Sequence, residues 1–213
     1  MDRLTEQDVY LFREGNHFRA HDMFGAHPGE HDGRRGTSFR VWAPNARAVS
    51  LIGDFNDWAD DVHPLTLRED CSGIWESFVP DVERGALYKY RVVRRSGEIF
   101  DKSDPYAFRT ELPPRTASVV WNLDYEWGDA QWMAQRGARN ALDVPMSVYE
   151  MHLGSWRRNA QEGYRHLTYR ELAHELADYV AHLGFTHVEL LPVMEHPFYG
   201  SWGYQVTAFF APS

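Results

Sequence analysis

The sequence lacks the features that commit a chain to disulfides, membranes or export. Cys71 is the only cysteine among 213 residues, so no intrachain disulfide can form and a reducing, cytoplasmic setting is expected. The longest apolar stretches are far too short to cross a bilayer. The first residues, MDRLTEQDVYLF, lack the basic start and apolar run of a signal peptide. A cytoplasmic protein without a membrane partner is therefore predicted.

Charge and residue spacing exclude further classes of function. The formal net charge is −9, which disfavours nucleic acid and anionic membranes as partners, because both select clustered Lys and Arg. The eleven histidines are scattered and show no H-E-x-x-H spacing, so no metal site is predicted. No glycine-rich phosphate loop is present. An acidic surface suits a neutral substrate, although such surfaces more often serve solubility alone.

The chain is long enough for one large domain or two small ones, and its composition permits a sizeable core. Hydrophobic residues make up 43% and charged residues 25% of the sequence. Changes in composition and periodicity divide it into an arm or linker at 1–36, a β-rich block at 37–125, a connector at 126–142 and an α/β block at 143–213.

The β-rich block carries the pattern of an antiparallel sandwich. SFRVWAP alternates apolar and polar residues, and AVSLIGDF, IWESFVP and LYKYRVV follow as short β-rich runs. Turn-forming pairs such as Pro44-Asn45 separate these runs. Strands at this spacing predict a small antiparallel sandwich of immunoglobulin-like size. Trp42 and Trp75 lie inside alternating runs and are predicted to be core residues.

The last block changes period and predicts one β-α-β unit. SVYEMHL at 147–153 is a short apolar strand, and HVELLPV at 187–193 is a second strand of the buried type. Between them, Thr168 and Glu171 form a capping box, and Gly184 stands where a helix C′ glycine belongs. One helical face collects the apolar residues Leu172, Leu176, Tyr179, Val180 and Leu183. This unit is the building block of parallel α/β folds.

Trp58 and Lys89 are candidate sugar-binding residues. Trp58 closes the strand–turn GDFNDW, and Lys89 stands between Tyr88 and Tyr90 on a later strand. An exposed indole offers a flat apolar face to the C–H side of a glucose ring, and a nearby ammonium can hydrogen-bond its hydroxyls. The competing interpretation is that Trp58 is an ordinary core aromatic of the sandwich, which composition alone favours.

Three stretches between residues 37 and 108 carry a family resemblance. TSFRVWAPNARAVSLIGDFNDW, GIWESFVPDVERGALYKYRV and KSDPYAF resemble the glycogen-binding β-sandwich module, carbohydrate-binding module family 48, that precedes the barrel in glycogen branching enzymes. The resemblance implies that Trp58 and Lys89 occupy sugar-contacting positions. A second aromatic platform is expected near Gly97, where this sequence offers Phe100 at a shifted spacing.

Two motifs of the last block are more specific. YEMHLGSWR begins at Tyr149, and LPVMEHPFYGSWGYQVTAFFAP begins at Leu191. They resemble the first two strand ends of the barrel in 1,4-α-glucan branching enzymes of the α-amylase superfamily (glycoside hydrolase family 13). The resemblance implies that Tyr204 stacks on the glucose whose bond is broken, flanked by Trp202 and Gln205. Without the resemblance, a loop-packing role for Tyr204 would be equally acceptable.

The fold implied is an immunoglobulin-like β-sandwich followed by the first β-α-β unit of a truncated (β/α)8 TIM barrel. The active site of such a barrel lies at the C-terminal ends of its strands, near Glu150, Glu189 and Glu195. Retaining glycosyl transfer needs two carboxyls about 5 Å apart. In the family the catalytic carboxylates come from later strands, so these three glutamates are expected to have structural roles and this chain to contain no catalytic residue.

The resemblance implies a transferase of glycogen biosynthesis. The intact protein would cleave an α-1,4-glucan (glycogen, amylose or amylopectin) and pass the cut chain to a 6-hydroxyl, making an α-1,6 branch. No cofactor is expected, because a carboxylate pair supplies both nucleophile and proton. This chain alone is expected to be inactive. The alternative is a non-catalytic glucan-binding protein that uses Trp58 and Lys89; a debranching hydrolase is disfavoured by HLGSW and PVMEHP.

Overall fold

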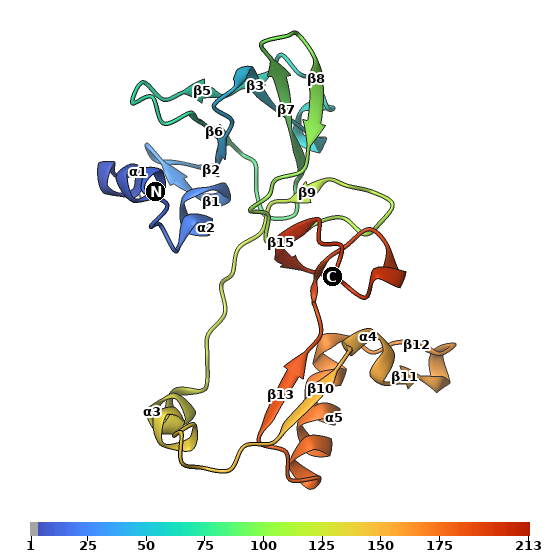
Figure 1. The fold of residues 1–213 in the computed structure, drawn as a ribbon. Coiled ribbons are helices and arrows are strands. Elements are labelled where there is room, and N and C mark those ends of the chain that lie inside the picture. Colours follow the sequence, from blue (N-terminus) through green and yellow to red (C-terminus); the bar gives the residue numbers. More distant parts are fainter. Residues whose placement is uncertain (1–3) are drawn as a thin grey trace. The chain divides into compact units, whose positions relative to one another are not determined.

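The computed structural model describes residues 4–213, which form two compact units. Unit 1 comprises the described residues up to Leu123 together with Met194–Pro197 and Val206–Ser213. Unit 2 comprises Asp124–Val193 and Phe198–Gln205. Figure 1 shows that unit 1 is built mainly of strands, whereas most of the helical residues of unit 2 lie in α3 and α5. The two units are described separately.

Unit 1 is an antiparallel β-sandwich. One sheet has the strand order β1-β2-β6-β5, from Gly25–His31, Arg34–Trp42, Ile74–Pro80 and Thr66–Leu67. The other has the order β4-β3-β7-β8, from His63–Pro64, Ala46–Gly53, Leu87–Arg94 and Ile99–Lys102, and β9 (Ser118–Val119) also pairs with β7. Every pairing within these sheets is antiparallel. The sequence prediction of an antiparallel sheet fold is confirmed.

A single apolar cluster joins the two sheets. Phe39 on β2 and Tyr88 on β7 have no exposed surface, and their rings meet edge to face at 5.0 Å. Alternate residues of β3, Val49 and Leu51, enter the same cluster. Trp75 joins them as predicted and is 7% exposed. Burial of one such side chain contributes about 1.5–3 kcal/mol, so this cluster is the main source of the sandwich's stability.

The sandwich begins earlier than the predicted boundary at residue 37. Strand β1 pairs with β2 along its whole length, from Gly25 opposite Arg40 to His31 opposite Arg34. It is an edge strand of sequence GAHPGEH, in which only the first two residues are buried. An edge strand of this composition has no apolar alternation by which a sequence pattern could reveal it.

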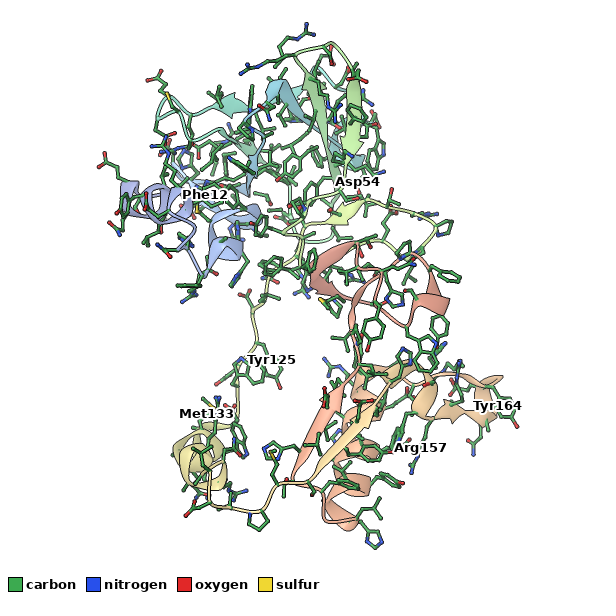
Figure 2. The ribbon with its side chains drawn as sticks, in the orientation of Figure 1. Phe12, Asp54, Tyr125, Met133, Arg157 and Tyr164 are labelled. Atoms are coloured by element: carbon green, nitrogen blue, oxygen red, sulfur yellow. The ribbon has the colours of Figure 1, made fainter. Side chains whose placement is uncertain are left out.

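Two short helices pack beside the sheet β1-β2-β6-β5. Val9 of α1 (Glu6–Arg13) and Met23 of α2 (Ala20–Met23) form a second buried cluster with Phe24 and Ile74. Thr5 and Asp8 form a capping box that starts α1. Figure 2 marks Phe12 among the side chains of this part of the unit.

The prediction that Trp42 is a core residue is wrong, because its side chain is 52% exposed. It ends β2, and its indole Nε1 donates a hydrogen bond to the carbonyl oxygen of Ser72 at 3.1 Å. Its ring lies 5.7 Å from that of Phe12 on α1. The alternating sequence pattern continues to Trp42, but burial in β2 ends at the residue before it.

The last residues of the chain return to unit 1. Strands β14 (Met194–Glu195) and β15 (Ala208–Pro212) pair antiparallel. Phe210 stacks on Tyr106 with ring centroids 5.2 Å apart, and it lies 5.4 Å from the ring of His21. The predicted block 143–213 is thus divided in the structure, because Phe210 packs on aromatic rings of unit 1 and Ala208 and Ala211 of β15 are buried there.

Unit 2 contains the predicted β-α-β unit. Strands β10 (Val148–Met151) and β13 (His187–Leu190) pair in parallel and flank α5 (Tyr169–His182) along the chain. The Thr168–Glu171 capping box begins α5, and Gly184 follows its end with a φ of 79°. The remaining elements of the unit are α3 (Ala130–Arg139), α4 (Leu153–Trp156), β11 (Arg158–Asn159), β12 (Arg165–His166) and the 3-10 helices η2 (Ala160–Glu162) and η3 (Tyr199–Ser201).

The apolar residues of unit 2 are less covered than the sequence predicted. Tyr149 packs on Tyr179 and Phe185, with ring centroids 5.7 and 5.1 Å away. Val188 and Leu190 of β13, however, remain 38% and 46% exposed, so the buried strand predicted at 187–193 is not buried here. Two strands and one helix cannot cover both faces of a parallel sheet. Within residues 4–213, no helix is long and apolar enough to span a membrane.

Candidate functional site

The turn that carries Trp58 is tightly specified by its backbone. After β3 ends at Gly53, residues Asp54–Asn56 form a single 3-10 turn, and Asp57 and Trp58 both adopt left-handed conformations with φ of 51° and 60°. The amide of Trp58 donates to the carbonyl oxygen of Gly53 at 2.8 Å. A Cβ on Gly53 would lie 2.2 Å from the carbonyl oxygen of Leu87, so only glycine fits there.

Side-chain hydrogen bonds secure the same turn. The Oδ1 atom of Asn56 accepts from the amide of Gly53 at 2.9 Å, and its Nδ2 donates to the carbonyl oxygen of Leu51 at 3.0 Å. Asp54, marked in Figure 2, accepts the amide hydrogen of Leu87 at 3.0 Å. The turn is therefore fixed both to the strand it leaves and to β7.

The indole of Trp58 is available to a ligand. It is 39% exposed and does not belong to the buried cluster of the sandwich. The structure therefore contradicts the interpretation of Trp58 as a core aromatic. Two consecutive left-handed residues that are not glycine cost conformational free energy, and such strain persists only where the surrounding contacts enforce it.

Lys89 lies on the outer face of the same sheet. Its neighbours Tyr88 and Tyr90 are fully buried, so the alternation of β7 turns Lys89 away from the core. It pairs with Ile52 of β3, one residue before the turn that carries Trp58 begins. Its ammonium donates to the Thr116 hydroxyl at 2.7 Å. Trp58 and Lys89 thus come from adjoining segments of one sheet.

An arginine fork that the sequence did not reveal supports this surface. Arg91 Nε and Nη2 donate to the two carboxylate oxygens of Asp101 at 2.7 and 2.9 Å, and Nη1 donates to Asp60 at 2.9 Å. These hydrogen bonds lower the pKa of Asp101. Asp60 follows Trp58 by two residues, so the fork ties the loop to β7 and β8.

Phe100 does not join Trp58 and Lys89. It stands opposite Val92, which packs against the core cluster, and directly opposed residues of an antiparallel pair share a face. Phe100 therefore lies on the other face of the sheet from Lys89. The guanidinium of Arg94 covers its ring, with Cζ at 4.5 Å from the centroid. The predicted second platform is not formed by this residue.

A buried carboxyl lies beneath β7. Asp104 is 1% exposed, accepts a 2.5 Å hydrogen bond from the Tyr88 hydroxyl, and accepts another from the amide of Tyr106 at 2.8 Å. Burial raises the pKa of Asp104 to about 6, against the opposing effect of these hydrogen bonds. This carboxyl links the strand that carries Lys89 to the segment on which Phe210 stacks.

Trp202, Tyr204 and Gln205 share one loop of unit 2. Trp202 and Gly203 adopt φ of 56° and 85°, and the indole of Trp202 lies 5.3 Å from the ring of His152. The amide of Tyr204 donates to the carbonyl oxygen of Ser201 at 3.0 Å, and the Tyr204 side chain is 68% exposed. Its ring is open to solvent, as a stacking platform requires, so the loop-packing alternative finds no support.

The glutamates divide into two groups. Glu150 and Glu189 are exposed and stand directly opposite each other in the parallel pair β10–β13. Glu195 belongs to unit 1 and is 6% exposed; its Oε2 accepts from the Thr110 hydroxyl at 3.1 Å and its Oε1 from the amide of His196 at 3.1 Å. Both carboxylate oxygens of Glu195 are thus engaged, as a structural role requires. Among the described residues, no group of three or more potential ligands could hold a metal ion.

The chain is similar to known proteins over nearly its whole length. Residues 23–107 match the model of carbohydrate-binding module 48, the isoamylase N-terminal domain. The chain is 56% identical to the 1,4-alpha-glucan branching enzyme GlgB of Albidiferax ferrireducens over 98% of its residues, and 55% identical to that of Aquifex aeolicus over 99%. Both alignments cover 33% of the relative, so the chain spans about a third of their length.

Solved structures show the same type of fold. The maltotriose complex of a PulA mutant from Klebsiella pneumoniae matches 81% of this chain and 20% of its own, with a TM-score of 0.57 and 26% identity. GBS pullulanase SAP in complex with maltotetraose matches 89% of this chain and 28% of its own, with a TM-score of 0.63; at 20% identity this likeness shows the fold alone. Over nearly its whole length, the chain is therefore similar to the amino-terminal region of the 1,4-alpha-glucan branching enzymes, carbohydrate-binding module 48 included.

Proposed function

We propose that this chain is the amino-terminal part of a 1,4-α-glucan branching enzyme. The intact enzyme cleaves an α-1,4-glucan, holds the cut chain as a covalent glucosyl-enzyme, and transfers it to a 6-hydroxyl to form an α-1,6 branch of glycogen. The observation that carries this proposal is identity of 50–56% to four branching enzymes over 98–99% of the chain. Amylose and amylopectin are further substrates, and the reaction takes place in the cytoplasm without a cofactor.

The loop of unit 2 provides part of the donor-sugar site in this proposal. The open ring of Tyr204 stacks on the glucose whose bond is broken, and Trp202 and Gln205 border it. Aromatic stacking suits the apolar face of a pyranose, and the amide of Gln205 can both donate to and accept from sugar hydroxyls. The β10-α5-β13 unit is the first β-α-β unit of a (β/α)8 barrel, whose strand ends hold such loops.

The sandwich contributes a weak glucan-binding surface. The exposed face of Trp58 and the outward ammonium of Lys89 support this role, because they supply an apolar platform and a hydrogen-bond donor on one sheet. Binding here holds polymeric substrate near the enzyme and takes no part in bond cleavage.

The three glutamates of this chain are not the catalytic pair. Glu195 has both carboxylate oxygens engaged within unit 1. Glu150 and Glu189 are register partners in the parallel pair β10–β13, so they are the two carboxylates that a test of this expectation has to address. We expect the isolated chain to show no turnover.

Incubation of the purified chain with amylose tests this assignment, with iodine colour reporting branching and reducing ends reporting hydrolysis. Neither should change. Turnover that is abolished by Glu150→Gln or Glu189→Gln, and retained in Glu175→Gln on the exposed side of α5, would identify the catalytic carboxylates in this chain and contradict the proposal.

A second candidate is a non-catalytic glucan-binding protein. The exposure of Trp58 favours it, because that surface needs no barrel to bind a glucan. Two measurements separate the two functions. The chain is fused to the remaining two thirds of the Albidiferax ferrireducens relative, and the fusion is assayed for branching activity and for glycogen binding in a pull-down. Branching by the fusion supports the first candidate, and glycogen binding by an inactive fusion supports the second.

A further inference from the structure

A second concave surface lies on the sheet that carries neither Trp58 nor Lys89. It is a groove of about 430 Å³ over β2, β5 and β6, which is within the size range of small-molecule sites. The polar residues of its lining are His31, Ser38, Arg40, Thr66, Arg68, Glu76 and Ser77. Arg40, Glu76 and Thr66 form one row across three strands, because Glu76 is the register partner of both others.

Arg40 is the unusual member of this row. It alternates with the core residues Phe39 and Val41, which places it on the outer face of β2, yet its side chain is only 8% exposed. Its Nε donates to Glu76 Oε2 at 3.1 Å. Among residues 4–213, no acceptor is found for its two terminal nitrogens. Neither nitrogen is among the buried donors without a partner, so water reaches both, and the acceptor oxygens of a ligand in the groove can replace that water.

The carboxylates near the groove do not use all the N–H donors of its two arginines. The second carboxylate oxygen of Glu76 accepts from Arg68 Nη1 at 2.9 Å, so a single carboxylate serves two guanidinium groups. Arg68 Nε is directed at Asp70, at 2.8 Å. The hydroxyls of Thr66 and Ser77 add further donors to the lining. Two arginines and one glutamate give the lining a net charge of +1, in a chain whose net charge is −9.

We propose that this groove binds the phosphate group of a small phosphomonoester. A planar guanidinium presents two parallel N–H donors that match two oxygens of a phosphate, and phosphate oxygens accept without requiring donors elsewhere. A neutral sugar would satisfy the two guanidinium groups less well, because its hydroxyl oxygens carry no negative charge and accept weaker hydrogen bonds than phosphate oxygens do. The ring of Phe78, which also lines the groove, provides an apolar wall for the rest of the ligand.

Isothermal titration of the whole chain tests the proposal at constant ionic strength, with inorganic phosphate, a hexose monophosphate and the unphosphorylated hexose as separate ligands. The phosphorylated ligands should bind saturably and the hexose should not. Thr66→Glu should weaken phosphate binding at least tenfold, because the new carboxylate competes for Arg40 from an exposed position on an edge strand. Thr66→Gln is its matched control and should stay within twofold of the unmodified chain.

Two more variants distinguish a built site from general attraction to cations. Arg40→Lys retains the positive charge but loses the two parallel N–H donors of the guanidinium, so it should also weaken phosphate binding at least tenfold. Circular dichroism establishes whether this variant is folded. If it is not folded, the comparison of Thr66→Glu with Thr66→Gln decides the question. Arg95→Gln removes an exposed cation elsewhere and should have no effect. Equal phosphate affinity in Thr66→Glu and Thr66→Gln, the absence of saturable phosphate binding, or stronger binding of the hexose would each overturn the proposal.

Discussion

Trp58 owes its exposure to the backbone that presents it. Its ring is not packed into the sandwich, and the hydrogen bonds of Gly53, Asn56 and Asp54 hold the turn in place without using the indole. A turn built in this way keeps an aromatic ring in solvent at a fixed orientation, so little conformational entropy is lost when a ligand stacks on it.

Replacement of Trp58 by alanine should therefore weaken glucan binding and leave the fold intact. Loss of a stacked aromatic costs on the order of 1–3 kcal/mol of binding free energy. Affinity electrophoresis in glycogen measures the effect. Trp127→Ala, which removes an indole that is 73% exposed, is the matched control and should migrate like the unmodified chain. Equal retardation of both variants would remove Trp58 from the binding surface.

Asp104 should make the stability of unit 1 depend on pH. Its pKa is about 6 in the fold and about 3.9 in an unfolded chain, so the folded state holds the proton more tightly. Stability from this group is complete below pH 4 and declines as pH rises through 6, by about 2–3 kcal/mol. The neutral variant Asp104→Asn should lack this decline.

Urea unfolding at pH 4.5, 5.5 and 7.5 measures the difference between the two proteins. Asp101→Asn is the control of opposite sign, because Arg91 lowers the pKa of Asp101 and its contribution is lost only as pH falls through that lowered value. A difference between the unmodified chain and Asp104→Asn that stays constant from pH 4.5 to 7.5 would show that Asp104 titrates normally.

At the scale of elements, the end of α5 has a specific backbone requirement. Gly184 adopts a φ of 79° with open space around its α-carbon, so an added methyl group meets no neighbour and acts through the backbone alone. Gly184→Ala should destabilise unit 2 by about 1 kcal/mol. Gly137→Ala, in the open interior of α3, should instead favour its helix by about 0.5–1 kcal/mol. Amide hydrogen exchange in α5 and α3 measures both, and faster exchange in α3 of Gly137→Ala would contradict this reasoning.

Local signals predicted the elements that depend on local chemistry. The capping box at Thr168 and the glycine at 184 specify the ends of α5, and alternation specified the inner strands of the sandwich. Strand β1 escaped prediction because its residues show no apolar alternation, although it forms a hairpin with β2 around Asp32 and Gly33; the β14–β15 pair escaped because β14 has only two residues. At the candidate site, Trp58 and Lys89 were proposed from residue type together with the family resemblance, whereas the contact of Arg91 with Asp60 joins residues 31 positions apart and left no sequence signal.

At the scale of the whole molecule, the two units should differ in resistance to protease. No residue of α3 is buried, and Figure 2 marks Met133 on this helix and Tyr125 on the segment that precedes it. Trypsin should cut first at Arg136 and Arg139, whereas Arg40 and Arg91 in the sandwich are protected by strand pairing. Mass spectrometry identifies the fragments.

The double variant Arg136→Gln and Arg139→Gln should delay the first cut without changing the later ones. Residues 143–193 should be lost before residues 25–123, because Val148, Val188 and Leu190 leave apolar surface uncovered in unit 2. Survival of 143–193 for as long as the sandwich would show that the β-α-β unit is stable without further partners.

The return of β15 to the sandwich also has a consequence for synthesis on the ribosome. Thr110 and Glu195 are hydrogen-bonded across a separation of 85 residues, and Phe210 reaches Tyr106 and His21 across a longer one. At about 5–20 residues per second, the nascent sandwich waits roughly 4–17 s for Glu195 after Thr110 has been made. Throughout that interval the rings of His21 and Tyr106 lack their contact with Phe210. The incomplete chain therefore exposes aromatic surface through which it can associate with neighbouring chains on the same polysome.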